Sequence, residues 1–154
     1  MTATKYCLSC GDEKDISEFE PSRNVCYPCR QRAHQKRVSS SPEVYLRQLH
    51  AKSKAACKKG KRQALDFKIT PEDIIDLYHK QQGRCALSGV ILTHHKDGSG
   101  HKEFNISIDR LNNDLGYTID NIRLVAYRLN MMRGTMTNDM FYWWVRTIND
   151  FTCR

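Results

Sequence analysis

Four cysteines near the start of the chain have the spacing of a metal-binding site. Cys7 and Cys10 form one C-x2-C pair, and Cys26 and Cys29 form a second pair after fifteen intervening residues. Two short knuckles of this kind bring paired thiolates to one tetrahedral ion, which suits zinc. Four protein thiolates leave no open position, so the predicted zinc ion is structural. Two disulfides are the alternative, which a reducing compartment disfavours.

The three remaining cysteines have no such spacing. Cys57, Cys85 and Cys153 are expected to be free thiols, because an unpaired cysteine behaves as a small hydrophobic residue. Cys85 has one alternative role, as part of an incomplete second metal site together with His94 or His95.

The sequence of residues 105–133 predicts two short strands followed by a helix. Apolar and polar residues alternate over 105–110, which is the pattern of a half-buried strand. Turn-forming residues follow, and apolar residues resume over 121–125 as a second strand. Residues 127–132 suit a helix, and Gly134 stands where a C-terminal cap belongs.

Three polar side chains lie at the junctions of these elements. Asp109 is near the end of the first strand, Asn121 opens the second and Asn130 lies on the helix. Together with a G-Y-T run in the turn, this order resembles the HNH (His-Me finger) nuclease motif. The alternative is an ordinary hairpin and helix with a polar turn.

The resemblance implies a role for each of these residues. Asp109 and Asn130 occupy the positions that bind the catalytic Mg2+ or Mn2+, and Asn121 occupies that of the Asn that ties the loop and orients the catalytic group. Arg110 stands where the family usually has the His that activates water, as in a subset of phage HNH proteins with Asp-Arg at this step. Arginine keeps its proton, so Arg110 is predicted to bind the scissile phosphate instead.

The general base is therefore expected outside the strand. His94, His95 and His101 lie in a polar loop before residue 105, and the pKa of histidine is near the working pH. His95 and His101 complete the predicted catalytic set, and a loop without a catalytic role is the alternative. Tyr117, in the G-Y-T run, is a further candidate, although its position favours packing or a phosphate hydrogen bond.

Positive charge is concentrated between Arg30 and Arg62, where Glu43 is the only acidic residue, and the chain carries a formal net charge of +8. A helix is predicted from Pro42 to about residue 59, with Ser41 as its N-cap. DNA contacts are predicted for Arg32, Lys36, Arg37, Lys54, Lys58, Lys59, Lys61 and Arg62. Such phosphate contacts position a protein without reading base sequence. A solvated helix face is the alternative.

These features predict an α+β protein with three parts. A zinc-ribbon-like module is expected over 1–37, a basic hinge and helix over 38–62, and a ββα-metal (HNH) core wrapped by helices over 63–154. Within the last part, Thr70 is predicted to cap a further helix. Apolar residues at helical spacing over 137–151 predict a core or dimer helix, buried rather than exposed for base stacking.

The function predicted from this pattern is metal-dependent DNA cleavage, either nicking or cutting both strands. Double-stranded DNA and a second copy of the chain are the expected partners. No apolar run of membrane-spanning length and no signal peptide is evident, so a cytoplasmic protein is expected, and the resemblance suggests a phage origin. Two alternatives are a degenerate HNH protein that binds DNA without cutting it, which Arg110 favours, and a zinc adaptor for a protein partner.

Overall fold

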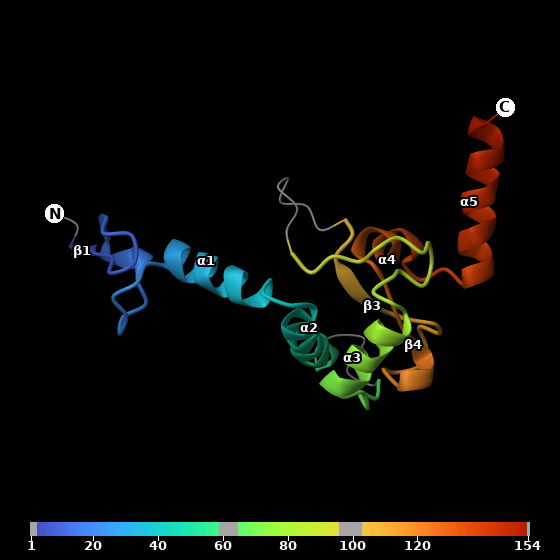
Figure 1. Ribbon diagram of the computed structural model, residues 1–154, viewed down its shortest axis with the longest axis horizontal. Helices are drawn as coiled ribbons and strands as arrows, with labels where there is room; N and C mark the ends of the chain where they lie inside the picture. The colour runs from blue at the N-terminus through green and yellow to red at the C-terminus, as the bar shows by residue number, and fades with distance from the viewer. Residues whose placement is uncertain (1–2, 59–64, 96–102, 154) are drawn as a thin grey trace. The chain divides into compact units, whose positions relative to one another are not determined.

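The computed structural model describes residues 3–58, 65–95 and 103–153. Two compact units divide the chain between Ser40 and Ser41 (Figure 1). Helices and short antiparallel sheets occur together, so the predicted mixture of α and β structure is confirmed. No helix in these three ranges is long and apolar enough to cross a membrane. Four residues with predicted roles lie outside the described residues: Lys59, Lys61, Arg62 and His101.

The first unit contains a small hairpin and one helix. Strand β1 (Thr4–Tyr6) pairs antiparallel with β2 (Glu13–Asp15), and helix α1 (Tyr27–Val38) begins directly after Cys26. Its core cluster is made of Cys7, Phe19, Cys26 and Cys29, with Cys10 and Val25 packed against them. Cysteines therefore form most of the interior of this unit.

The second unit contains four helices and one two-stranded sheet in its described residues. In chain order these are α2 (Pro42–Cys57), α3 (Pro71–Lys80), β3 (Ile106–Arg110), β4 (Ile122–Ala126), α4 (Tyr127–Arg133) and α5 (Asn138–Thr152). Side-chain oxygens of Ser41, Thr70 and Thr137 accept hydrogen bonds from the first turns of α2, α3 and α5. Such caps satisfy backbone N–H groups that a helix leaves free at its start.

Strands β3 and β4 form the hairpin that carries the candidate site. They pair antiparallel, with Asp109 opposite Arg123 and Arg110 opposite Ile122. All five residues of β4 are buried, whereas β3 is buried at Ile106, at Ile108 and at Asp109. Both strands lie within one residue of the bounds that the sequence predicts.

Helices α2 and α3 pack against the hairpin and hold it by polar contacts as well. Tyr45 on α2 donates its hydroxyl to Ile106 O (3.2 Å). Gln81, directly after α3, binds the backbone of Leu124 twice: its Oε1 accepts from the N–H (2.9 Å) and its Nε2 donates to the carbonyl (2.8 Å). The core enclosed by these elements includes Leu46, Cys57, Ile74, Leu92, Ile108, Val125 and Phe141.

The loop of the hairpin is held against the segment that precedes α3. Phe67 and Tyr117 form an isolated parallel bridge, Lys68 N–H donates to Tyr117 O (2.9 Å), and Tyr117 N–H donates to Asp66 O (2.8 Å). A Cβ at Gly116 would lie 2.2 Å from Asp66 O, so the two backbones approach this closely only because residue 116 is glycine.

The segment after Gly83 contains no regular strand in its described residues. It forms a turn, and its backbone pairs through isolated bridges, of Arg84 with Ile91 and of Thr93 with Asn105, rather than as a strand. A regular strand therefore does not extend the two-stranded sheet on this side.

Helix α5 contradicts its prediction most clearly. The sequence predicts that its apolar stripe is buried, yet Phe141 is the one residue of α5 that is fully buried. Trp144, Ile148 and Phe151 expose 47%, 58% and 78% of their surface. The expected burial in the core is therefore wrong for most of the stripe, because Phe141 and Tyr142 are the residues of α5 that pack against the core of the second unit. Burial against a second copy stays a prediction.

Candidate functional site

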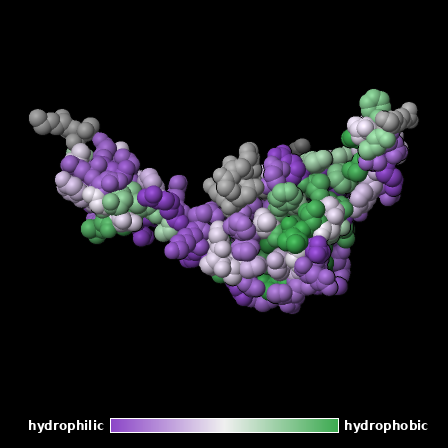
Figure 2. All heavy atoms as spheres, turned by 45° about the horizontal axis from the view of Figure 1, so that its top comes forward, coloured by the Kyte–Doolittle hydropathy of each residue, from purple (hydrophilic) through white to green (hydrophobic). Residues whose placement is uncertain are grey.

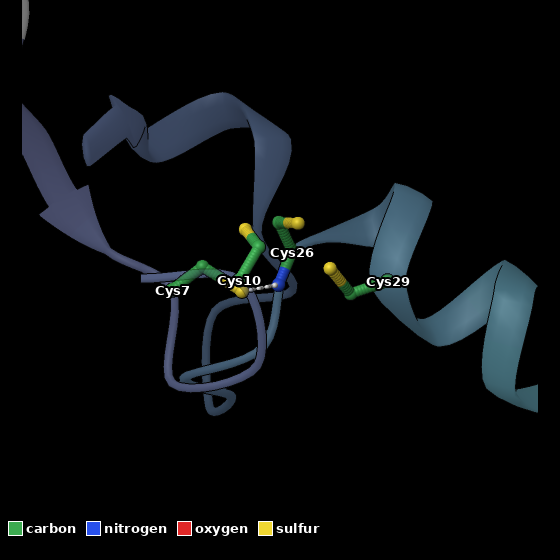
Figure 3. A group of neighbouring side chains, drawn as sticks. All are labelled: Cys7, Cys10, Cys26 and Cys29. Carbon is green, nitrogen blue, oxygen red and sulfur yellow. Dashed lines mark hydrogen bonds between the residues drawn. The ribbon is translucent and has the colours of Figure 1, made fainter. Parts of the chain in front are cut away.

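The four N-terminal cysteines converge on one point (Figure 3). Their Sγ atoms all lie within 4.8 Å of one another. Sulfurs bound to a tetrahedral zinc at about 2.3 Å lie roughly 3.8 Å apart, so the cluster can hold such an ion after small movements. No other group of three or more His, Cys, Asp and Glu side chains converges in this way among the described residues. Cys85, considered for an incomplete second metal site, accepts a hydrogen bond from Ala126 N–H at its Sγ (3.2 Å).

Hydrogen-bond donors surround the cysteine sulfurs. Cys7 Sγ accepts from the backbone N–H groups of Cys26 and Ser9 (both 3.4 Å), and the Cys26 contact, with lesser ones, lowers the pKa of Cys7 to about 6. The Arg32 guanidinium donates to Cys29 Sγ (3.0 Å) and lowers the pKa of that thiol. Both effects favour the thiolate, which is the form that binds metal. Arg32, a predicted DNA contact, therefore also contacts a metal-site cysteine.

Asn130 faces the hairpin from helix α4. Its Nδ2 donates to Ser107 Oγ (2.8 Å) and to Ile108 O (3.2 Å). Arg133 follows three residues later on the same face of α4 and reaches the next residues of β3. Because Nδ2 is held by the strand, the amide oxygen of Asn130 is the atom that remains to bind an ion.

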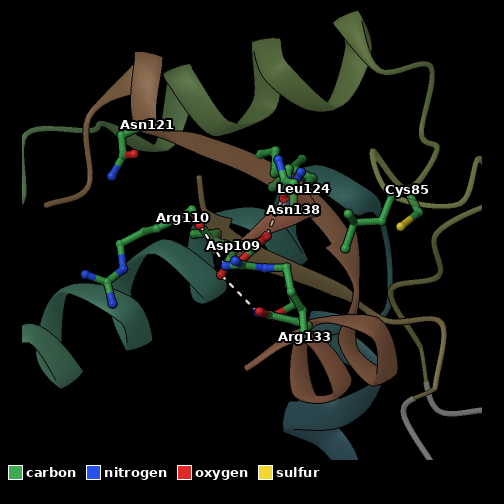
Figure 4. Close-up of polar contacts among 12 residues, drawn as sticks. Cys85, Asp109, Arg110, Asn121, Leu124, Arg133 and Asn138 are labelled. Atoms are coloured by element: carbon green, nitrogen blue, oxygen red, sulfur yellow. Dashed lines mark hydrogen bonds and ion pairs between the residues drawn. The ribbon is translucent and has the colours of Figure 1, made fainter. Parts of the chain in front are cut away.

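Asp109 is buried between two arginines, Arg123 and Arg133, of which Figure 4 labels Arg133. Arg123 Nε lies 2.8 Å from its Oδ2, Arg133 Nη2 lies 2.5 Å from its Oδ1, and the Asp109 side chain is 2% exposed. Arg123 also donates to Asn138 Oδ1 (2.7 Å), and Arg133 donates to Arg110 O (2.8 Å). The carboxylate is therefore neutralised inside the protein, and its loss would leave two buried cations without a partner.

This environment fits a divalent ion in part. Carboxylate and amide oxygens are the ligands that Mg2+ and Mn2+ prefer, and each Asp109 oxygen keeps a lone pair beyond its arginine contact. A cation would nevertheless approach two guanidinium groups of the same sign, and the carboxylate has almost no contact with solvent. Binding of an ion at Asp109 therefore requires Arg123 or Arg133 to move.

Asn121 closes the loop between the two strands. Its Nδ2 donates to Asn112 O (3.0 Å) and to Gly116 O (2.8 Å), and its Oδ1 accepts from Asn112 N–H (2.9 Å). A buried amide with three such bonds fixes the path of the loop. Asn121 lies apart from Asp109 (Figure 4), so it orders the loop without touching the carboxylate.

Arg110 extends away from Asp109 (Figure 4). Its Nη1 donates to Asn113 O and Leu115 O (both 2.9 Å), and its guanidinium lies 5.2 Å from the centre of the Tyr117 ring. Adjacent residues of a strand point to opposite faces, which accounts for the divergence of Arg110 and Asp109. Nη2 and Nε of Arg110 are the donors that remain for an anion.

His94 and His95, the described candidates for the base, lie toward the other end of β3. Thr93 pairs with Asn105 directly before this strand, so His94 and His95 follow there, and their ring centres are 5.4 Å apart. At about 3.3 Å per residue, Asp109 lies roughly 13 Å farther along the strand than Asn105. The structure therefore does not bring His94 or His95 together with the carboxylate.

The predicted DNA contacts that the structure describes are all exposed. Three lie on α1, namely Arg32, Lys36 and Arg37. Lys54 lies on α2 and Lys58 directly after it, one helical turn farther, so they share one face of that helix. Their exposure leaves these charges accessible to a phosphate backbone.

The sequence analysis did not identify several residues of the site. Arg123 could have been found, because it stands opposite Asp109 once the two predicted strands are paired. Arg133 could have been found from its spacing to Asn130, since residues three apart share a helix face. Gln81 comes from outside the hairpin and helix, and no sequence signal identifies it.

Comparisons with known proteins give a distant likeness. No family model matches the chain, and no curated protein matches it. Among solved structures, a similar chain is the rare-cutting HNH restriction endonuclease PacI, described as having an extraordinary mechanism of DNA perturbation. The match has a TM-score of 0.44 and 17% sequence identity, and it covers 95% of this chain and 94% of that chain.

Proposed function

We propose that the chain is a metal-dependent DNA endonuclease of the HNH type with a structural zinc module. The position of Asn130 carries this proposal. Helix α4 holds its amide against Ser107 and Ile108, directly before Asp109 on the same strand. One amide and one carboxylate thus stand close together in a strand–strand–helix unit. A divalent ion held by their oxygens would stabilise charge on the leaving oxygen of a phosphodiester.

Other residues of the loop would position the substrate. Arg110 would bind a non-bridging phosphate oxygen through Nη2 and Nε, since Nη1 is held by the carbonyls of Asn113 and Leu115. Asn121 orders that same loop, so it fixes the Arg110 guanidinium indirectly. His101 stays the candidate for the base, because Arg110 cannot accept a proton and His95 lies by the start of β3 rather than beside Asp109.

Double-stranded DNA is the proposed substrate because the chain is basic and exposes lysines and arginines on α1 and α2. Zinc is the proposed ion for the four cysteines because soft thiolate ligands in a closed tetrahedral set select it. The zinc would stabilise the first unit, whereas Mg2+ or Mn2+ would serve the hairpin.

DNA binding without cleavage is the second candidate. Both oxygens of Asp109 are bound by arginines that are themselves almost fully buried, and this ion-paired cluster needs no metal. The neighbouring residue is Arg110, which cannot activate water. A protein with this hairpin could therefore bind phosphates through Arg110 and its exposed lysines and leave the backbone intact.

A plasmid-nicking experiment separates the two candidates. Supercoiled plasmid would be incubated with the zinc-loaded protein and Mg2+, Mn2+ or a chelator, using wild type, Asn130→Ala and Ser107→Ala. Both substitutions remove the hydrogen bond between Asn130 and Ser107, but only Asn130→Ala removes the proposed ligand. Asp109→Ala is unsuitable, since it disturbs a buried ion-pair cluster. Thermal unfolding would verify that each variant is folded.

The proposal expects metal-dependent nicking by wild type and Ser107→Ala and its loss in Asn130→Ala. Intact plasmid under all conditions, together with a gel shift of the DNA, would support the second candidate, DNA binding without cleavage. Intact plasmid and no shift would reject both functions. Nicking that persists in folded Asn130→Ala would remove this residue from the metal site.

A further inference from the structure

Helix α5 presents an apolar stripe to solvent. Met140, Trp144, Ile148 and Phe151 follow one another at spacings of four, four and three residues, which places them on one side of a helix. Met140 exposes 49% of its surface, and the other three expose between 47% and 78%. Figure 2 shows hydrophobic side chains gathered along one side of α5 and hydrophilic ones along the other.

The charges of α5 argue against DNA as the partner of this stripe. Its charged residues are Asp139, Arg146 and Asp150, so the helix is slightly acidic in a chain with a net charge of +8. Proteins that stack bases on aromatic side chains combine them with a positively charged groove. The Trp144 side of α5 lacks the lysines and arginines that such a groove requires.

The stripe is complementary to itself. Two α5 helices that cross antiparallel at residue 146 place Trp144 of one copy against Ile148 of the other, and Met140 near Phe151. Each large aromatic side chain thus meets a smaller flexible or branched one, as a two-fold interface requires. Antiparallel helices also oppose their dipoles.

The apolar area suits a small dimer interface. Aromatic side chains have about 150–250 Å² each, so the stripe exposes on the order of 500 Å² per copy. The largest apolar patch on a typical monomer measures about 300–600 Å², and such a patch often marks an interaction site. Two copies would bury roughly 1,000 Å² through the stripe alone, which is the lower bound for a specific interface. Polar residues at the edges of α5 would add a rim.

We propose that a second copy of this chain covers the stripe of Met140, Trp144, Ile148 and Phe151, with the two α5 helices antiparallel. This inference does not depend on the proposed nuclease activity. It gives the exposed half of α5 a partner and makes the protein a two-fold dimer.

The two tryptophans of the chain are both in α5, which allows a direct test. Trp143 and Trp144 expose 50% and 47% of their surface, and their ring centres lie 4.8 Å apart, so both indoles report on the environment of the stripe. Sedimentation equilibrium of the full chain, zinc-loaded, is expected to show twice the mass of the 17.9 kDa chain at micromolar concentration. Dilution should shift the tryptophan emission to longer wavelength as Trp144 becomes exposed.

Variants of single residues test whether the stripe on α5 holds the dimer together. Ile148→Glu would place a charge in the interface and is expected to raise the dimer dissociation constant by about tenfold or more. Ile91→Glu is the matched control, because Ile91 is also an exposed isoleucine but lies outside α5, and it should leave the dissociation constant unchanged. Trp144→Ala serves in place of Ile148→Glu if that variant is unfolded by circular dichroism. A monomeric wild type, or equal weakening by Ile91→Glu, would overturn the proposal. Quenching of the emission by duplex DNA in a monomer would assign the stripe to nucleic acid instead.

Discussion

At the scale of single residues, Asp109 has a structural role whatever its role in catalysis. Its carboxylate neutralises two guanidinium groups, those of Arg123 and Arg133, in a place that solvent hardly reaches. Removing one partner of a buried ion pair costs far more than removing an exposed charge, because the remaining charge stays desolvated. We therefore expect Asp109→Ala to lower the free energy of unfolding by about 3–5 kcal/mol. Urea denaturation measures this change.

Asp120→Ala is the matched control for that measurement. Asp120 belongs to the same hairpin loop but is exposed, so its removal should change the free energy of unfolding by less than about 0.5 kcal/mol. If Asp109→Ala unfolded at the same urea concentration as wild type, the arginines would not depend on this carboxylate. Asp109 would then be free to act as an ion ligand alone.

The contrast between Asp109 and its partners shows what the sequence could reveal at this scale. The order of Asp109, Asn121 and Asn130 along the chain was enough to single them out. Pairing the two predicted strands and counting along the helix brings Arg123 and Arg133 to the side of Asp109, but the contact of each arginine with a separate carboxylate oxygen does not follow from the sequence. The burial of Asp109 is likewise a tertiary property that local sequence does not encode.

At the scale of elements, the first unit is predicted to need its metal. Apart from the four cysteines, Phe19 and Val25 are the apolar side chains of its core cluster. A core this small cannot offset the conformational entropy that the chain loses on folding. Metal binding must therefore supply the remaining free energy of folding. We expect one zinc per chain, and we expect its removal by a chelator to abolish the α1 helix signal in circular dichroism.

Cys26→Ser should reproduce the effect of the chelator, whereas Cys153→Ser should not, because Cys153 is exposed in the other unit. The second unit has its own larger core, so its urea transition should survive zinc removal. Retention of the α1 signal without metal would show that the first unit is stable without zinc.

Helix α2 gives a separate prediction about DNA. Lys54 and Lys58 are exposed one turn apart, and each phosphate contact releases condensed counterions. The double variant Lys54→Gln, Lys58→Gln should weaken binding and reduce the slope of log affinity against log salt by about 1.8. Lys80→Gln on α3 is the control, and it removes one positive charge where the double variant removes two. Fluorescence anisotropy with a labelled duplex measures both, and an equal effect of Lys80→Gln would contradict a specific role for α2.

Elements with strong local signals were predictable, and those without were not. Helices α2 and α3 have capping residues and proline at their starts, and the hairpin strands have alternating or continuous apolar residues. Helix α1 has proline near its start but neither an apolar face nor a side-chain cap, so no helix was predicted there. The stripe of α5 predicted the helix correctly but not its exposure, since periodicity cannot tell whether a partner lies within the same chain.

At the scale of the whole molecule, the proposed dimer and the proposed nuclease together determine how many strands are cut. The two strands of DNA are antiparallel, so a two-fold dimer can present one hairpin site to each strand. A monomer holds one such site and would nick one strand at each binding event. We therefore expect wild type to convert supercoiled plasmid into linear product as well as open circles.

Ile148→Glu should shift this product ratio without removing the chemistry, because α5 contributes none of the proposed ion ligands. Open circles should accumulate, and the ratio of linear to open-circular plasmid should fall about tenfold if the variant is monomeric at the assay concentration. Ile91→Glu, outside α5, should give the wild-type ratio. An unchanged ratio in a variant shown to be monomeric would mean that one chain cuts both strands in succession, and that α5 pairing serves a purpose other than cleavage.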